Sequence, residues 1–269
     1  MWLTVSATFT RNFLIMRRAY PWSFFIGHIL SGTYVVIFAY LTYFYVFEGD
    51  MDSRFNQLAG TNDYISYTIL GGLLFSFSVS LLMIVSRTLI TEFREGTLDS
   101  LLLTPSSRNG YFLGATAQGL MRLGLEFLAI ILVGGLFGLS FYNVNVLGCL
   151  VILFVLIFAT FSQSLVLGGF MLYFRDTYIT QNTLFVLMGL VCSITFPTEY
   201  LPLGVHWIGE MMPLTHGVDA FRQMFIEGTP ITEVKLEIFK MIGLGFIYLL
   251  VGMVLIRRME KFIIEKHFG

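Results

Sequence analysis

The sequence is poor in charge: Asp, Glu, Lys and Arg together make up 12% of its 269 residues, whereas a soluble domain carries about 25%. A water-exposed surface cannot be built from so little charge. A soluble enzyme or a nucleic-acid-binding protein is therefore excluded, and no nucleic acid is expected as a partner. The 16 basic and 17 acidic residues nearly cancel, so the net charge identifies no ligand.

The residues that build cofactor, metal and catalytic sites are also scarce. The only two cysteines, Cys149 and Cys192, lie in apolar runs without CxxC spacing, which favours simple packing roles. None of the four lysines follows a glycine and precedes Ser or Thr, as a phosphate-binding loop requires. His206 and His216 are ten residues apart, a poor spacing for a metal site. We expect no catalytic residue, bound cofactor or metal in this chain.

Long apolar runs are abundant, since hydrophobic residues make up 56% of the chain. A helix needs about 20 apolar residues to cross a bilayer core of about 30 Å. Six segments fit, and the segment at 178–197 is the weakest because its start is polar. The sequence predicts a single all-α membrane domain over 1–269 with six transmembrane helices, at residues 22–47, 64–90, 111–139, 146–173, 178–197 and 239–256.

Basic residues are distributed unevenly over the predicted loops, and this asymmetry sets the orientation. With a cytoplasmic N-terminus, the inner side holds 11 Lys and Arg residues and the outer side holds four. Arg122, inside the third span, is not counted. We therefore predict a multi-pass protein of the cell membrane (inner or plasma membrane) with both termini in the cytoplasm.

The first 20 residues precede the first span and have an amphipathic pattern. Apolar residues recur every three or four positions, as on one face of a helix: Trp2, Val5, Phe9, Phe13, Met16 and Tyr20. The sequence predicts a helix over residues 1–20 that lies in the inner headgroup layer among membrane lipids. The alternative is a frayed leader without a fixed structure.

A short amphipathic helix is predicted between the second and third spans, at 92–103. Pro105 ends it, because the residue before a proline disfavours the helical conformation. One face carries leucines and the other carboxylates: Leu98, Leu101 and Leu102 against Glu92, Glu95 and Asp99. This helix is either a passive surface loop or a docking element for a soluble partner.

The outer segment 198–237 is apolar but broken by proline and glycine into pieces too short to cross the membrane. Irregular backbone at membrane depth is tolerated where protein or a water-filled cavity covers it. We expect a re-entrant pair of half-helices, near residues 204–211 and 216–226, with Val218, Phe221 and Phe225 on the buried side. The pair is either a gate or an outer cap.

Arg122 and Glu126 are four residues apart in the third span, so they share a helix face and can pair. Ionisable residues inside a membrane are costly and commonly functional. Arg122 could instead lie near the inner interface, where its side chain would reach the headgroups. A role in transport and a role in packing both remain open.

Two motifs carry a family resemblance. The inner loop reads EGTLDSLLLTP at residues 95–105, and the outer segment contains FPTEYLP at 196–202 followed by PLTHGVDAFR at 213–222. Together they resemble the signature of ABC-2 type permeases, the membrane subunits of one class of ATP-binding-cassette exporters. One departure is Met212 before Pro213, where the family often has asparagine.

The resemblance implies two six-span permease subunits, identical or related, and two cytoplasmic ABC ATPase subunits that carry the ATP and Mg. It implies that the helix at 92–103 is a coupling helix seated in a groove of the ATPase, with residues Glu92, Phe93, Glu95, Gly96, Thr97, Leu98, Asp99, Leu101 and Leu102. It also implies an outer gate formed by Pro197, Glu199, Tyr200, Pro202, Pro213 and Arg222.

The expected function is therefore export of an amphiphilic drug, natural product or lipid-like substrate from the cytoplasm or inner leaflet. Within the same family, export of a lipid-linked glycan is the alternative. Outside it, the alternatives are an ATP-independent channel or secondary carrier and a membrane sensor without transport. A secondary carrier would favour several buried charges and an inverted repeat, whereas this chain has one candidate pair and no evident repeat.

Overall fold

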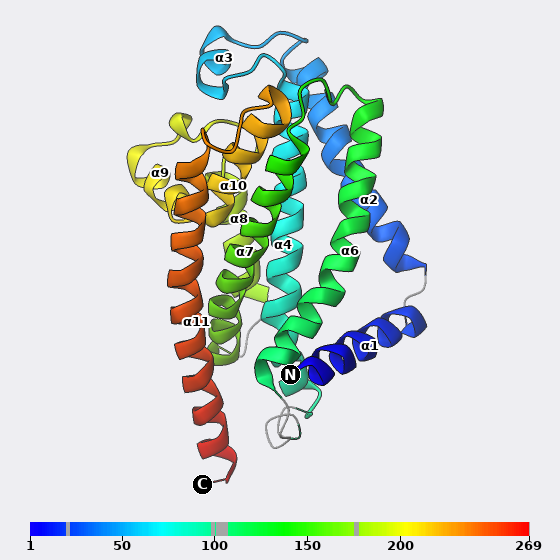
Figure 1. Ribbon diagram of the computed structural model, residues 1–269, viewed down its shortest axis with the longest axis vertical. Coiled ribbons are helices and arrows are strands. Elements are labelled where there is room, and N and C mark those ends of the chain that lie inside the picture. The colour runs from blue at the N-terminus through cyan, green and yellow to red at the C-terminus, as the bar shows by residue number, and fades with distance from the viewer. Residues whose placement is uncertain (20–21, 98–99, 101–106, 175–177, 269) are drawn as a thin grey trace.

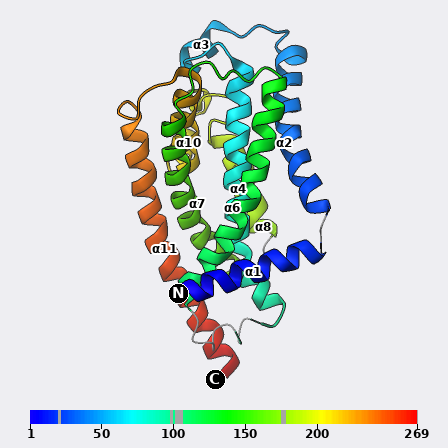
Figure 2. The same ribbon diagram turned by 45° about the vertical axis from the view of Figure 1, so that its right-hand side comes forward.

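The computed structural model describes residues 1–19, 22–97, 100, 107–174 and 178–268. Within these residues the chain is helical and contains no strand. The long helices lie side by side in a bundle, and both ends of the chain lie at the same end of it (Figures 1 and 2). We call this end of the bundle the terminal end and the opposite end the distal end.

The helices follow the predicted order along the chain. A π-helical turn, Thr42–Val46, extends α2, and another, Gln223–Glu227, extends α10. The remaining elements are α1 Trp2–Ala19, α2 Ser23–Leu41, α3 Ser53–Ala59, α4 Tyr64–Arg94, α6 Arg108–Leu136, α7 Val146–Phe174, α8 Tyr178–Val191, α9 Leu203–Glu210, α10 Pro213–Arg222 and α11 Lys235–Phe268.

Among the described residues, four helical stretches are long and apolar enough to cross a membrane: Tyr64–Thr88, Asn109–Leu136, Val146–Phe174 and Lys235–Met259. Two further apolar stretches, Thr33–Val46 in α2 and its extension and Gln181–Val191 in α8, are shorter. The predicted all-α membrane class is confirmed at this level. The layout of six spans stays a prediction.

Local signals in the sequence explain where several helices begin. Asp52 accepts a hydrogen bond from the Arg54 amide at the start of α3, and Ser107 accepts one from Gly110 at the start of α6. Both are side chains favoured at helix N-caps, where they satisfy amides that have no partner within the helix. Pro213 occupies the first position of α10, where its fixed backbone angle fits the helix and its missing amide costs nothing.

Helix α4 lies at the centre of the bundle. It contacts α2, α6, α7, α8 and α10, and its Leu73 and Leu74 are almost fully buried. Ile130 of α6 and Leu156 of α7 are in the same buried cluster. Burying a leucine or isoleucine side chain contributes about 1.5–3 kcal/mol, so this cluster fixes the position of α4 relative to its neighbours.

The N-terminal helix α1 lies across the terminal end of the bundle, as Figure 2 shows. It packs against α6 at two glycines of that helix. A Cβ atom at Gly114 would lie 2.6 Å from the Val5 carbonyl oxygen and 2.7 Å from Cβ of Thr8. The predicted helix is present, but its buried side includes the polar Thr8, whereas Trp2 is 80% exposed.

We expect Gly114→Ala to push α1 away from α6, because the added methyl group meets a backbone carbonyl that cannot rotate aside. Overpacking of this kind costs about 1–3 kcal/mol. The matched control is Gly124→Ala in the same helix, where an added Cβ has no atom within 4 Å and alanine improves helix propensity by about 1 kcal/mol. Thermal unfolding of both variants in one detergent measures the difference. Equal midpoints would show that the α1–α6 contact does not need the glycine.

Candidate functional site

At the distal end, two short helices, α9 and α10, lie where the sequence predicted half-helices near 204–211 and 216–226. Helix α10 begins three residues before the predicted start, and the re-entrant character of the pair stays a prediction. Helix α10 packs against α4, α7 and α11. Its Val218 and Phe221 are 0% and 1% exposed, and Phe225 in the following π turn is 6% exposed. These are the three residues predicted for the buried side, so that prediction is confirmed. The distal end of the bundle is therefore filled by α10 rather than merely covered by it.

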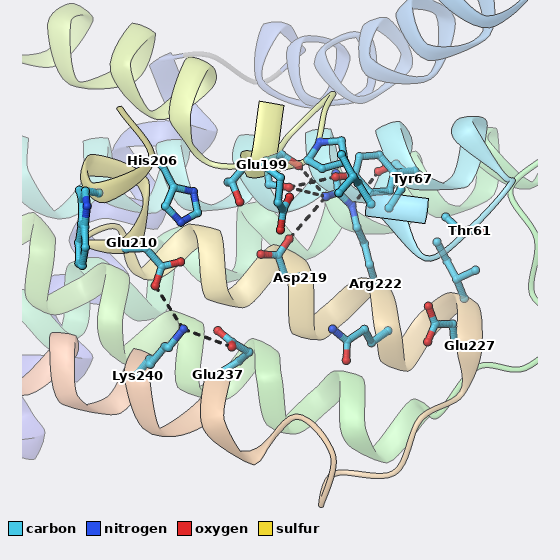
Figure 3. A pocket seen from close by; sticks show the side chains of 18 residues that line it. Thr61, Tyr67, Glu199, His206, Glu210, Asp219, Arg222, Glu227, Glu237 and Lys240 are labelled. Carbon is cyan, nitrogen blue, oxygen red and sulfur yellow. Dashed lines mark hydrogen bonds and ion pairs between the residues drawn. The ribbon is translucent and has the colours of Figure 1, made fainter. Parts of the chain in front are cut away.

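Arg222, at the end of α10, connects three segments of the chain. Its Nε donates to the Tyr67 carbonyl of α4 at 3.0 Å. Its Nη1 and Nη2 donate to the carbonyls of Ser193 and Ile194, beyond the end of α8, at 2.6 and 2.7 Å. Figure 3 shows the Arg222 side chain beside Tyr67. The planar five-donor guanidinium suits this task, because it can bind several acceptors at once.

The surroundings of Arg222 are shaped to hold it. The guanidinium carbon lies 3.4 Å from the centre of the Tyr67 ring, a cation–π contact. The Tyr67 hydroxyl and Ser193 Oγ are 3.0 Å apart and share a hydrogen bond. At Gly71 a Cβ atom would meet both Arg222 Nη2 and the Ile194 carbonyl, so only glycine leaves room for the guanidinium on α4. Each hydrogen bond to a charged group contributes about 1.5–3 kcal/mol.

A cavity of about 480 Å³, here called the distal pocket, opens beside Arg222. Its wall is rich in carboxylates, and Lys240 of α11 reaches into it (Figure 3). The acidic residues that line it are Glu199, Glu210, Asp219, Glu227 and Glu237. Within the described residues, no group of three or more His, Cys, Asp or Glu side chains has the arrangement of a metal site.

The predicted gate residues divide into two groups. Pro197, Glu199 and Arg222 line the distal pocket together. Tyr200 lines a neighbouring apolar cavity of about 570 Å³, which Pro197 shares. Pro202 precedes the first residue of α9, and Pro213 begins α10, so both set the ends of half-helices rather than line the distal pocket. The role of all six as a gate stays a prediction.

The hydrogen-bond acceptors of Arg222 and the glycine that leaves room for it were not predicted from the sequence: Tyr67, Ser193, Ile194 and Gly71. Tyr67 and Gly71 read as ordinary members of an apolar span, and Arg222 bonds to backbone carbonyls, which leave no trace in residue type. Ser193 has a positive φ of 55°, which is uncommon for a residue with a side chain. No pattern in the sequence predicts this backbone conformation at Ser193.

His216 of α10 joins α10 to α9 and α11. Its Nδ1 lies 2.6 Å from Oε2 of Glu237 and its Nε2 lies 2.9 Å from the Glu210 carbonyl. The ring is 2% exposed. Burial opposes the charged ring, but the hydrogen bonds to Glu237 and Glu210 outweigh it and raise the pKa of His216 above its ordinary value of 6.5. Lys240 donates to the carboxylates of both Glu210 and Glu237 and completes the cluster.

Glu92 lies near the terminal end, in the last turns of α4. It is 5% exposed and accepts hydrogen bonds from Arg11 of α1 at 2.7 Å, from Tyr111 of α6 at 2.6 Å and from Thr97. Burial opposes its charge, but the bonds from Arg11, Thr97 and Tyr111 outweigh it and hold the pKa of Glu92 below its ordinary value. Glu92 thus ties α1, α4 and α6 together.

This position differs from the sequence expectation, which placed Glu92 on the carboxylate face of a separate short helix at 92–103. Helix α4 continues to Arg94, so Glu92 and Phe93 belong to it. Glu95, Gly96 and Thr97 follow and are exposed. The rest of the predicted docking helix, including Leu98, Asp99, Leu101 and Leu102, lies outside the described residues.

The predicted intramembrane pair lies on α6. Arg122 donates to Oε1 of Gln118 at 2.9 Å, and Glu126, which is 3% exposed, accepts a hydrogen bond from Ser76 of α4. The Glu126 bond joins α6 to α4, whereas the bond from Arg122 to Gln118 lies within α6. Arg122 also lines a cavity at the terminal end, whereas Glu126 faces the interior between α4 and α6.

The described residues thus form a helical bundle with four apolar helical stretches of membrane-spanning length. The sequence model of one family, described as ABC-2 family transporter protein, matches residues 47–254. The chain belongs to this family, as the two motifs predicted. No match is found among curated proteins. ABC-2 permeases are transmembrane subunits that generally work with ATPase subunits.

The His216 cluster generates a prediction about pH. Because the pKa of His216 is raised on folding, its stabilisation is complete below the unfolded pKa and is lost as pH rises through the folded pKa. We expect the thermal midpoint of the purified chain to fall as pH rises above 6.5, the ordinary value, and through the raised pKa of His216. His216→Gln should remove this dependence and cost about 1.5–3 kcal/mol at low pH.

The matched control is His206→Gln, since His206 lines the same pocket outside the His216 cluster. The thermal midpoint of His206→Gln should depend on pH as the midpoint of the parent chain does. A pH profile that is the same for His216→Gln and the parent chain would contradict the assignment of a charged His216.

Proposed function

We propose that this chain is the permease subunit of an ATP-driven exporter. Two ABC ATPase subunits dock at the terminal end, and a second permease chain, identical or related, completes the translocation unit. ATP and Mg belong to the ATPases, and this chain contributes the membrane path. Family membership and the arrangement of the two ends of the bundle support this assignment.

The observation that carries the proposal is that one unbroken helix joins the two regions that carry the family motifs. Helix α4 has 31 residues, which gives it a length of roughly 46 Å. Near its start, Tyr67 and Gly71 hold Arg222 of the distal half-helix. Near its end, Glu92 holds α1 and α6 and leads into the predicted docking segment.

Such a helix can transmit force between the ends. A ligand shifts a conformational equilibrium only through a difference in its affinity for the two states. ATP provides this difference by drawing the ATPase subunits together. Because Glu92 is bonded to both α1 and α6, movement at the docking segment displaces three helices as one unit. At the far end of α4, the same movement reaches α10 through Arg222 and opens the distal end.

The translocation path runs between two permease chains. The space between α4, α6 and α7 within one chain is filled by side chains such as Leu74, Ile130 and Leu156, each at most 1% exposed. Exposed apolar residues instead form a stripe along one face of α6, at Leu128, Leu132 and Leu136. A second permease and lipid together can cover this face.

We propose an amphiphilic substrate: a drug, a natural product or a lipid-like molecule. The apolar cavity beside the distal pocket supports this class, because Phe47, Phe55, Phe196 and Tyr200 line it with aromatic rings. A lipid-linked glycan is the alternative, since aromatic rings also stack on sugars. The direction is outward, from the cytoplasm or the inner leaflet.

The terminal end faces the cytoplasm, and the protein is a multi-pass protein of the cell membrane. Two observations support this orientation. Basic residues are concentrated in the loops and tails on that side, and both ends of the chain lie at the same end of the bundle (Figure 1). The predicted coupling segment then faces the compartment that contains ATP.

We expect coexpression with a cognate cassette ATPase to yield a stable complex that hydrolyses ATP. Replacing both Leu101 and Leu102 with Glu should release the ATPase, because an apolar face cannot enter a groove once it carries two charges. The control is Leu203→Glu, at a leucine of α9 that is 81% exposed at the distal end. Copurification and ATPase activity measure docking.

Survival of the complex and its activity in the Leu101→Glu, Leu102→Glu variant would contradict docking through this segment. Ion or solute flux by the purified chain alone in liposomes would instead favour an ATP-independent channel or carrier. Substrate-stimulated ATP hydrolysis in nanodiscs, with amphiphiles and lipid-linked glycans compared, distinguishes the two substrate classes.

A further inference from the structure

A second cavity, here called the terminal cavity, lies between α1, α4 and α6. Its volume is about 630 Å³. Each of the three helices contributes one arginine to its wall: Arg11, Arg87 and Arg122. Figure 2 shows α1 lying across the long helices here, so the cavity is bounded on one side by a helix that runs across the bundle.

Two of these guanidinium groups, those of Arg87 and Arg122, donate hydrogen bonds to side-chain amides. Arg122 donates to Gln118 at 2.9 Å, and Arg87 donates to Gln181 of α8. Gln118 and Gln181 are only 1% and 5% exposed, and their amide nitrogens reach the sulfur atoms of Met16 and Met83. The side chains of Arg87 and Arg122 are therefore positioned by hydrogen bonds to buried glutamines.

Apolar side chains also line the cavity, among polar ones. They include Ile15 and Met16 of α1 and Met83 and Ile84 of α4. Arg87 lies seven residues before the end of α4 and Arg122 lies 14 residues after the start of α6, which places them roughly 10 Å and 21 Å along those helices. The cavity thus offers cationic groups and apolar side chains together.

Two acidic residues, Glu92 and Glu95, also line the cavity, and they differ in how they can offset the positive charge of the arginines. Glu92 is bonded to Arg11, Tyr111 and Thr97, and Glu95 is exposed. Guanidinium groups bind phosphate oxygens with two parallel hydrogen bonds, and such charge-assisted bonds are about twice as strong as neutral ones. A ligand that fits this wall has a phosphate group and an apolar chain.

We propose that the terminal cavity binds the phosphate headgroup of an anionic lipid, with its acyl chain against Ile15, Met16, Met83 and Ile84. The lipid joins α1 to α4 and α6 next to Glu92. This site needs the terminal end to lie in a lipid leaflet, but it does not depend on ATPase docking or on the exported substrate. Its failure and that of the exporter assignment are therefore separable.

The test measures binding of short-chain phosphatidylglycerol to the purified full chain by native mass spectrometry. Short-chain phosphatidylcholine and inorganic phosphate serve as comparison ligands. We expect phosphatidylglycerol to bind best and the double variant Arg87→Gln, Arg122→Gln to weaken it by about tenfold or more. The control Arg257→Gln, at an exposed arginine near the terminal end of α11, should bind as the parent chain does.

A second variant keeps the proposal testable if the double variant does not fold. Ile15→Trp keeps all three arginines and fills the cavity from α1, where Ile15 is 52% exposed, and we expect it to weaken lipid binding as well. Equal binding of phosphatidylglycerol and phosphatidylcholine, or unchanged binding in both variants, would overturn the proposal. Displacement of the lipid by equimolar inorganic phosphate would assign the cavity to a soluble phosphate ester instead.

Discussion

The distal half of this protein depends on one buried cation. Arg222 places its guanidinium against the backbone carbonyls of Tyr67, Ser193 and Ile194, and its side chain is 6% exposed. A charge can be buried at this depth only if hydrogen bonds replace its water. Helix α10 is therefore fixed to α4 and to the segment after α8 by geometry that no other side chain reproduces, and Gly71 provides the space for it.

The terminal half has a corresponding anchor of opposite charge. Glu92 accepts hydrogen bonds from α1 and α6 while it remains part of α4. The two anchors lie near opposite ends of one helix whose middle is packed by Leu73, Leu74 and their neighbours. Packed interiors transmit displacement because they are dense and hardly compressible. In an ABC-2 permease, this arrangement connects the predicted ATPase side to the predicted exit.

The sequence predicted those features that depend on residue type and period. Apolar run length predicted the long helices, the three-to-four spacing predicted α1, and the prolines and glycines of 198–237 predicted that this segment is divided into short helices. The buried side of α10 followed from Val218, Phe221 and Phe225. Contacts that join distant segments could not be predicted in the same way. The bonds from Arg222 go to backbone carbonyls, and the burial of Glu92 depends on the path of α1 across α6, which no local pattern encodes.

A distance measurement tests most directly whether Arg222 couples α4 to the distal end. Spin labels at the exposed Gln57 of α3 and Leu203 of α9, in the complex with the ATPase, report the distal separation with and without trapped ATP. We expect this distance to change in the parent chain when ATP is trapped. We expect Arg222→Lys, which keeps the charge but loses the planar guanidinium that binds several acceptors at once, to abolish this change while ATP hydrolysis continues. An unchanged parent distance, or an equal change in the variant, would contradict the claim.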